Sequence, residues 1–395
     1  MSKYRLQTII FVLTSFMLGC NEFIVVGVIS DIAKTLSVSV ATVGYLVTIY
    51  ATVFAISTPI ITVLTNRFSR YKVFMVLMAI FLLGNTLSGF ATTYGLLIAA
   101  RMTTAVVAGA IESFIIAFAN DIAPRDKRPI LIAWISAGFS IASVIGVPIG
   151  TAISTADSWH TAFHIISVIT LITYVLLAWL LPRQVDQSTG SVKEQLVFLT
   201  DKRVYLAVGL NLTMAATMYA YYTYIRPIIT EGLGFSVSSL NWLLFILGLM
   251  SIISNRLSGT LAERDGLRVV PWFYVADIVL LLLFPIAMGH AFWGFAILLA
   301  LALIVIIAGA PLQIHFLDVA AESYPQAMML AAAVNPIFFN VGISVGSATA
   351  SILLNHAGLK SLSFGAIAYA VISLILVLVL NHEMAKRRRS ELGNH

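Results

Sequence analysis

Long apolar runs separated by short polar segments dominate this chain. Each run has roughly 20 residues, the length at which a helix crosses a ~30 Å hydrocarbon core. Of the 395 residues, 60% are hydrophobic and only 10% are charged, whereas soluble domains carry about 25% charged residues. A soluble fold of this length could not bury so much apolar surface. Because backbone groups have no water partners in lipid, the runs predict membrane-spanning helices.

We predict twelve such spans and therefore an all-α integral membrane protein that crosses the bilayer many times. The eleventh span is long and contains Pro336, which predicts a kink or a tilt. The predicted spans are residues 6–29, 41–64, 72–92, 95–120, 129–153, 162–182, 203–230, 239–260, 268–289, 292–316, 325–354 and 361–381.

The basic residues predict the orientation of the spans, since cytoplasmic loops of membrane proteins carry an excess of Lys and Arg. If the N-terminus is cytoplasmic, 19 of the 23 Lys and Arg residues lie in cytoplasmic segments. Only Lys34 and Lys360 then lie in outside loops, and Arg101 and Arg226 lie within spans. Both termini are therefore predicted to be cytoplasmic. The basic run 386–389 would anchor the tail beside anionic headgroups, with a specific partner site as the alternative.

The longest polar connection, residues 183–202, divides the chain almost in half and is predicted to be a flexible linker. We expect six-helix bundles over residues 1–182 and 203–381 and a basic cytoplasmic tail over 382–395. One loop is repeated in the two halves at an offset of 197 residues. Duplicated bundles are a transporter architecture, with the substrate site between the halves. The paired positions are Leu64 with Leu261, Asn66 with Glu263, Arg67 with Arg264, and Ser69 with Gly266.

Several other classes of protein are disfavoured. The net charge of +6 comes from short basic clusters and not from one continuous stripe, so nucleic-acid binding is not expected. The single cysteine, Cys20, excludes a disulfide framework. The chain has no Walker A, GxGxxG or HExxH signature, and we predict no catalytic residue and no cofactor. His160 and His164 have metal-ligand spacing, but no third ligand is evident, so no metal site is predicted.

Three motifs resemble those of the major facilitator superfamily, specifically its drug–proton antiporters and its sugar and nucleoside efflux permeases. The loop from Gly259 to Gly266 is similar to the family's G-x-L-A-D/E-R-x-G loop. The first copy of this loop departs from it, because Thr62, Asn66 and Ser69 replace a glycine, an acid and a glycine. The other two motifs are Leu97-x-x-x-Arg101, which is similar to an intramembrane arginine motif, and Gly146-Val147-Pro148-Ile149-Gly150, which is similar to a motif of antiporters.

The resemblance implies two pseudo-symmetric six-helix bundles that export a small molecule in exchange for protons by alternating access. It also implies a monomer in the bacterial inner membrane, with protons as the coupling ion and no other cofactor. An importer or facilitator on the same fold is the nearest alternative, and a membrane receptor or enzyme is a more distant one. The residues expected to carry conformational motifs are Asn66, Arg67, Arg70, Gly146, Pro148, Gly150, Gly259, Glu263, Arg264 and Gly266.

Ionisable residues inside a bilayer are costly and are therefore candidates for function. Glu22 in the first span and Arg101 in the fourth lie at similar depths, and we hypothesise that they interact and that Glu22 exchanges protons. Burial and a nearby guanidinium act in opposite directions on the charge of a carboxyl group, so a conformational change can load or release a proton. Glu112 follows Arg101 by 11 residues on the same helix face and is a second candidate. Fixed structural contacts are the alternative for both carboxylates.

Two further intramembrane charges are harder to assign. Asp277 is predicted to be protonated or to face the eighth span, with a structural role favoured, and Arg226 could extend to the interface. Aromatic faces with a few polar groups suit planar, amphipathic or cationic compounds, although aromatic side chains also serve as interfacial anchors. The predicted substrate-binding residues are Asn21, Tyr219, Tyr222, Asn335, Phe339 and Asn340.

Overall fold

The computed structural model describes residues 3–65, 68–124, 127–183, 197–263 and 266–392. Over these ranges the chain is helical and contains no strand. Twelve helical segments within them are long and apolar enough to cross a membrane. The predicted all-α fold with twelve spans is therefore confirmed.

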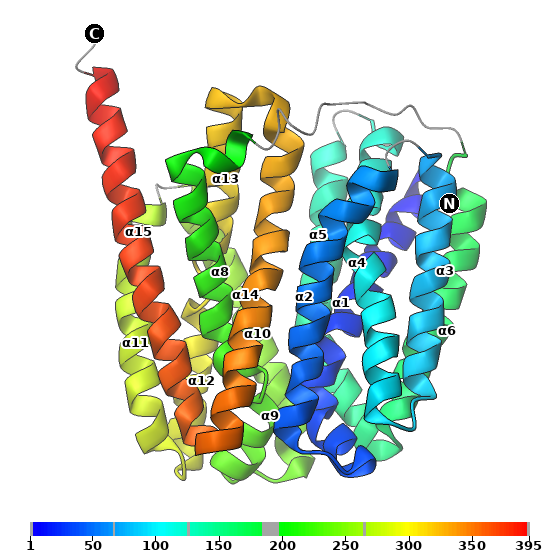
Figure 1. Cartoon of the computed structure of the whole chain (residues 1–395), viewed down its shortest axis with the longest axis vertical. Coiled ribbons are helices and arrows are strands. Elements are labelled where there is room, and N and C mark those ends of the chain that lie inside the picture. Colours follow the sequence, from blue (N-terminus) through cyan, green and yellow to red (C-terminus); the bar gives the residue numbers. More distant parts are fainter. Residues whose placement is uncertain (1–2, 66–67, 125–126, 184–196, 264–265, 393–395) are drawn as a thin grey trace. The chain divides into compact units, whose positions relative to one another are not determined.

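The chain divides into two compact units, of which unit 1 comprises Met1–Thr189 and Val237–Phe245 and unit 2 the remainder. Six helices of unit 1 run alternately up and down (Figure 1). Short polar turns join them, and the side chains of Thr93 and Ser158 cap the helices that follow. The six helices are α1 (Lys3–Leu36), α2 (Val40–Thr65), α3 (Arg70–Gly89), α4 (Tyr94–Ile122), α5 (Arg128–Ala156) and α6 (Trp159–Leu180).

Unit 2 has the same up-and-down arrangement but more breaks in its helices. Its longer helices are α8 (Lys202–Tyr222), α10 (Val237–Ala262, whose first residues are grouped with unit 1), α11 (Val270–Ala287), α12 (Ala291–Ile304), α13 (Gly309–Ser323), α14 (Met328–Ala357) and α15 (Leu362–Leu392). The shorter elements are η1 (Val197–Thr200), α9 (Ile225–Pro227), η2 (Ile228–Gly232), η3 (Gly266–Arg268), η4 (Pro325–Ala327) and η5 (Leu359–Ser361).

The predicted tenth span, 292–316, is broken between α12 and α13 for a specific chemical reason. Pro311 has no backbone N–H and cannot donate to the carbonyl of Ile307. Ser258 on α10 supplies the missing donor, with its Oγ 2.8 Å from the Ile307 oxygen. The same Oγ accepts a bond of 3.0 Å from the backbone N–H of Ala310. One buried hydroxyl therefore satisfies both sides of the break.

Two other predicted boundaries differ from the structure. The seventh span, predicted to reach residue 230, ends as a regular helix at Tyr222 and continues as the short α9 and the π-helical η2. The last span was predicted to end at residue 381, but α15 continues to Leu392, so most of the predicted tail is helical. Most of the predicted linker, together with its Lys193, lies outside the described residues.

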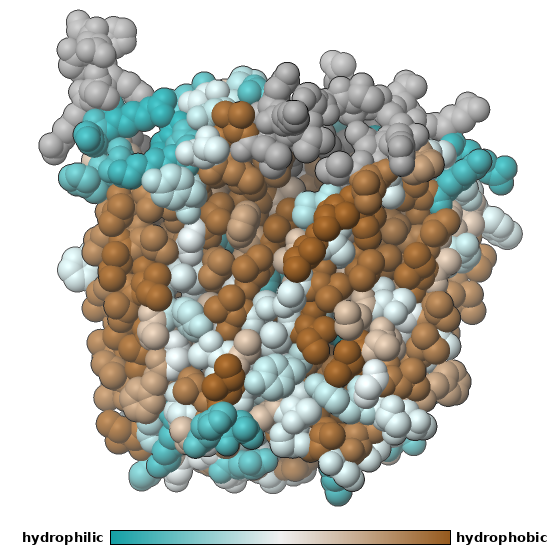
Figure 2. Space-filling view, in the orientation of Figure 1, coloured by the Kyte–Doolittle hydropathy of each residue, from teal (hydrophilic) through white to brown (hydrophobic). Residues whose placement is uncertain are grey.

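The outward surface of the helices is apolar. On the face shown in Figure 2, apolar residues cover much of the middle of the helices, with near-neutral residues among them, and hydrophilic residues gather near the helix ends. Trp179, Phe292 and Ile286 are 82%, 75% and 74% exposed. Such exposure would be costly in water, whereas lipid accommodates it.

Small residues permit close packing between α1 and α5 in unit 1. A methyl group on Gly150 would lie 2.5 Å from Cγ1 of Ile24, and one on Gly27 would lie 2.5 Å from Oγ1 of Thr151. A methyl group on Gly146 would lie 3.4 Å from Cys20, which is an ordinary contact. The glycine motif of α5 therefore lies at a helix–helix seam, and its closest point is Gly150.

Unit 2 contains a related seam between α14 and α8, formed by Gly342 and Gly346. These glycines follow Gly146 and Gly150 at an offset of 196 residues. A methyl group on Gly342 would lie 2.2 Å from the carbonyl oxygen of Leu212. The repeat therefore extends beyond the loop motif to a pair of packing glycines.

We expect Gly342→Ala to lower the stability of the folded protein by ~1–3 kcal/mol, because a backbone carbonyl cannot move aside as a side chain can. Gly146→Ala at the equivalent position should have little effect, since its neighbours leave room for a methyl group. Thermal unfolding of the two purified variants in detergent would compare them. Equal losses in the two variants would contradict the close approach at Gly342.

Candidate functional site

Arg101 on α4 is the centre of a buried polar group in unit 1. Its side chain is 1% exposed. Its Nη1 donates to the backbone oxygen of Asn21 at 2.8 Å and to Asn21 Oδ1 at 3.0 Å. Asn21 on α1 in turn donates from Nδ2 to Oδ1 of Asn85 on α3. Three helices of the bundle are thereby joined by one chain of hydrogen bonds.

Aromatic rings complete the surroundings of the guanidinium. The Cζ of Arg101 lies 4.2 Å from the ring centroid of Tyr50 on α2 and 5.9 Å from that of Phe163 on α6. Ring faces carry partial negative charge and attract a cation, by ~2 kcal/mol or more where water is excluded. The charge is therefore held by a carbonyl, an amide and two rings.

The structure brings Glu22 and Glu112 into the electrostatic surroundings of Arg101, but without direct bonds. The charges of Arg101 and Glu112 both act on Glu22, and all three act on Tyr50. Both carboxyl side chains are half-buried. Across the described ranges, Glu22 and Arg101 form neither a hydrogen bond nor an ion pair, and Nη1 of the guanidinium bonds to Asn21 instead. The four residues Asn21, Glu22, Arg101 and Glu112 nevertheless form one group.

The aromatic candidates of unit 2 also gather. The ring of Tyr219 on α8 makes edge-to-face contacts with Tyr222, at a centroid distance of 5.8 Å, and with Phe339 of α14, at 6.5 Å. The backbone oxygen of Asn335 accepts a bond of 2.8 Å from Asn211. Asn340 is 5% exposed and donates to the Pro336 oxygen at 3.3 Å. Hence α8 and α14 bring Tyr219, Tyr222 and Phe339 together within unit 2, whereas the bonds of Asn335 and Asn340 do not place their side chains against these rings.

The loop-motif residues have different structural situations. Asn66, Arg67 and Arg264 lie outside the described residues. Gly266 is required sterically, because a methyl group there would lie 2.5 Å from the Leu261 oxygen, whereas Gly259 has open space around it.

The two remaining members of the loop motif lie at helix ends. Arg70 begins α3, and Glu263 follows the last residue of α10.

The two histidines of the sixth span have packing partners. Nδ1 of His160 lies 3.0 Å from the Gly89 oxygen, and the ring of His164 lies 4.6 Å from that of Phe90. Within the part of the chain that the structure describes, no group of three potential metal ligands occurs.

Sequence reasoning missed three members of the Arg101 group, namely Asn85, Tyr50 and Phe163. Asn85 could have been found, because an amide in the middle of an apolar span needs a partner. Tyr50 gave no such signal, since one tyrosine in an apolar run looks like any other. Its role depends on α2 facing α4, which is a tertiary feature.

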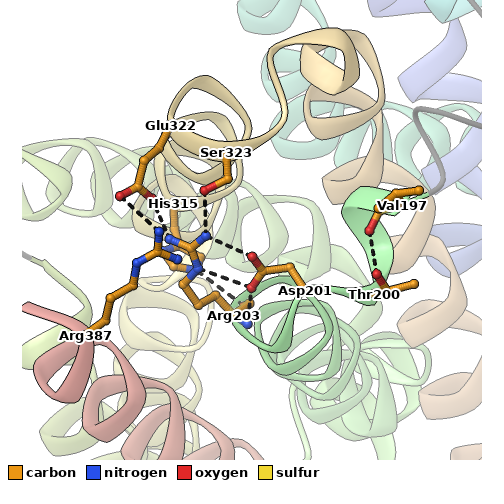
Figure 3. Close-up of polar contacts among 8 residues, drawn as sticks. All are labelled: Val197, Thr200, Asp201, Arg203, His315, Glu322, Ser323 and Arg387. Atoms are coloured by element: carbon orange, nitrogen blue, oxygen red, sulfur yellow. Dashed lines mark hydrogen bonds and ion pairs between the residues drawn. The ribbon is translucent and has the colours of Figure 1, made fainter. Parts of the chain in front are cut away.

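A second ionic group, also not predicted, lies at one end of unit 2 (Figure 3). Arg203 at the start of α8 binds Glu322 of α13 at 2.6 Å and Asp201 at 2.8 Å. Arg387 of α15 reaches Glu322 at 3.4 Å. Partial burial opposes the charge of Asp201, but its hydrogen bonds from Arg203 prevail and lower its pKa. The group joins the ends of three helices.

Comparison with known proteins gives a consistent result. The family model described as Major Facilitator Superfamily matches residues 11–332. Two proteins of Bacillus subtilis (strain 168), named as the uncharacterized MFS-type transporters YtbD and YbcL, are 28% and 26% identical to this chain. The first alignment covers 96% of each chain, and the second covers 97% of this chain and 98% of YbcL.

Solved structures share the fold at low sequence identity. A bacterial homolog of the human lysosomal transporter Spinster, inward-facing and occupied, matches with a TM-score of 0.76 and 15% identity, covering 95% of this chain and 96% of that one. A D-xylose–proton symporter matches with a TM-score of 0.74 and 13% identity, covering 96% and 97%.

We expect Asn21→Ala to be more destabilising than Asn85→Ala, because Asn21 serves both Arg101 and Asn85. Loss of a hydrogen bond to a charged group costs about 1.5–3 kcal/mol. The double variant should lose less unfolding free energy than the two single variants lose together. The difference, which is the coupling energy between Asn21 and Asn85, should be ~0.5–3 kcal/mol. Unfolding free energies of the three purified variants test this, and strictly additive losses would argue against a shared chain.

The Asp201 interaction should make stability depend on pH. Because its folded pKa is depressed, the interaction stabilises the protein above the ordinary aspartate pKa of about 3.9 and is lost as the pH falls through the folded value. The stability difference between wild type and Asp201→Asn should therefore shrink as the pH falls from about 5 through the folded pKa of Asp201. Thermal unfolding across this range measures it, and a constant difference would contradict the assignment.

Proposed function

Because the chain belongs to the major facilitator superfamily, we propose that it is a secondary active transporter that exports a small molecule in exchange for protons by alternating access. The observation that carries this proposal is the group formed by Arg101, Glu22 and Glu112 inside the apolar interior of unit 1. Each charge there is costly to bury, so a purely structural bundle would do better without them.

Charge balance explains how this group could exchange a proton for a substrate. With Arg101 positive, one ionised carboxyl group makes the site neutral, and a second leaves it with an excess negative charge. That excess can be cancelled by a proton or by a cationic group of a substrate. Because the interior penalises net charge, the two ligands compete, and binding of one favours release of the other. Competition of this kind is the physical basis of antiport.

The packing of α5 supports a role for α1 in this exchange. Gly146 and Gly150 contact Cys20 and Ile24, the residues two positions before and after Glu22. A rearrangement of the seam would therefore move the carboxyl group relative to Arg101. A change in that separation alters the affinity of Glu22 for its proton.

The aromatic group of Tyr219, Tyr222 and Phe339 supports a planar or cationic substrate, since rings bind such compounds through their faces. The distribution of basic residues supports cytoplasmic termini in a bacterial inner membrane. The chain would act as a monomer with protons as its only coupling ion.

A proton-coupled importer is the second candidate. The observation that favours it is the shared fold with a D-xylose–proton symporter. Reconstituted vesicles with an imposed pH gradient distinguish the two. An antiporter accumulates its substrate inside the vesicles when the lumen is more acidic than the outside solution. A symporter accumulates it when the outside solution is the more acidic. Lipophilic cations, sugars and nucleosides form the panel of compounds.

We expect Glu22→Gln to abolish gradient-driven accumulation while retaining exchange of labelled for unlabelled substrate. The amide keeps the shape of the carboxyl group but cannot take up a proton. Glu231→Gln is the matched control, because Glu231 is exposed and far from Arg101 in the sequence. Full gradient-driven activity in Glu22→Gln would remove Glu22 from the coupling mechanism.

A further inference from the structure

Asp277 on α11 is a buried carboxyl group in unit 2 that the proposed mechanism does not use. It is 1% exposed. Neither of its carboxyl oxygens has a hydrogen-bond partner among the residues that the structure describes. An ionised carboxylate in this position would lack every compensation that buried charges require, and the cost is several kcal/mol.

The side chains around Asp277 are tyrosines and hydroxyls. Its charge acts on Tyr274, one turn earlier on α11, and on Tyr221 of α8. On α15, which packs against α11, Ser373 lies beside the Tyr274 hydroxyl. No charged side chain in the described ranges acts on Asp277 from α8, α12 or α15. The surroundings can therefore hydrogen-bond an acid but cannot neutralise an ion.

A chain of hydroxyl groups leads from this site to α8. The hydroxyl of Tyr274 lies beside Ser373 and makes no hydrogen bond of good geometry within the described structure. Ser373 Oγ donates to Thr213 Oγ1 at 2.8 Å. Thr213 Oγ1 donates to the Gly209 oxygen at 2.9 Å. The donors that are fixed therefore point away from Asp277, toward a backbone carbonyl.

The direction of these donors fits a hydrogen-bond donor at the position of the Asp277 carboxyl group. A hydroxyl group that donates to the next one along still has lone pairs with which to accept. Because Ser373 already donates to Thr213, the Tyr274 hydroxyl can donate to Ser373 and still accept a hydrogen bond from an acid. A protonated carboxyl group has one O–H donor, which matches this requirement. With no cation acting on Asp277, the neutral acid is the form that its burial favours.

We propose that Asp277 is a proton-binding site of unit 2, separate from the Glu22 group, and that its bound proton is held at the head of the Tyr274–Ser373–Thr213 hydroxyl chain. Binding forms one O–H bond on a carboxylate oxygen and makes the side chain neutral. Release breaks that bond, restores the negative charge and passes the proton to a water molecule, on which the new O–H bond forms. Since Thr213 is on the same helix as Tyr219 and Tyr222, the chain connects the proton to the helix that carries the aromatic group.

Infrared spectroscopy of purified protein tests the site directly, because the carbonyl stretch of a protonated carboxyl group is distinct from that of a carboxylate. Spectra at neutral pH should contain such a band, and Asp277→Asn should remove it. Tyr274→Phe keeps the carboxyl group and should shift the band without removing it. Glu231→Gln, which removes an exposed carboxyl group, should leave the band unchanged.

Two results would overturn the proposal. One is a spectrum at neutral pH in which neither Asp277→Asn nor Tyr274→Phe alters any protonated-carboxyl band. The other is loss of the band on addition of sodium at constant pH, which would identify a metal cation as the ligand. The test is independent of the proposed export, because Glu22→Gln should retain the Asp277 band.

Discussion

Arg101 carries a full positive charge in the apolar interior of unit 1, and this charge determines which groups must surround it. The guanidinium cannot lose its charge, so its neighbours must compensate for the lost water. The protein does this with Asn21 and with the faces of Tyr50 and Phe163. None of these partners is an ion, and Glu22 and Glu112 form no hydrogen bond or ion pair with Arg101 in the described ranges.

This arrangement explains why the glycine seam matters for chemistry as well as for packing. The residues that contact Gly146 and Gly150 flank Glu22 on α1. Glycine lets the two helix backbones approach closely, and it therefore fixes the depth and rotation of the carboxyl group relative to Arg101. A small shift of the seam translates into a change of electrostatic environment without any change in the residues present.

The membrane spans could be predicted from the sequence because they depend on local composition, whereas contacts between helices could not. Spans follow from runs of apolar residues, because lipid requires each backbone group to be paired within its own helix. The break before Pro311 could have been predicted from the proline, but the Ser258 hydroxyl that satisfies it comes from another helix and could not. Similarly, the depth of the residues along their helices correctly placed Glu22 near Arg101. The side chain that bonds to the guanidinium, however, belongs to the neighbouring residue. That residue is Asn21, whose rotation about α1 depends on the packing of α5.

The two halves of the chain repeat their packing but not their charges. Gly146 and Gly150 recur as Gly342 and Gly346 at an offset of 196 residues. At the same offset, Met218, Ile297 and Ala308 stand in place of Glu22, Arg101 and Glu112. Close helix packing is needed in both halves, whereas the buried charges of one half need not be repeated in the other. Unit 2 carries the buried Arg226 and Asp277 and the ionic group of Arg203 at the helix ends, and these lie at other positions than the charges of unit 1.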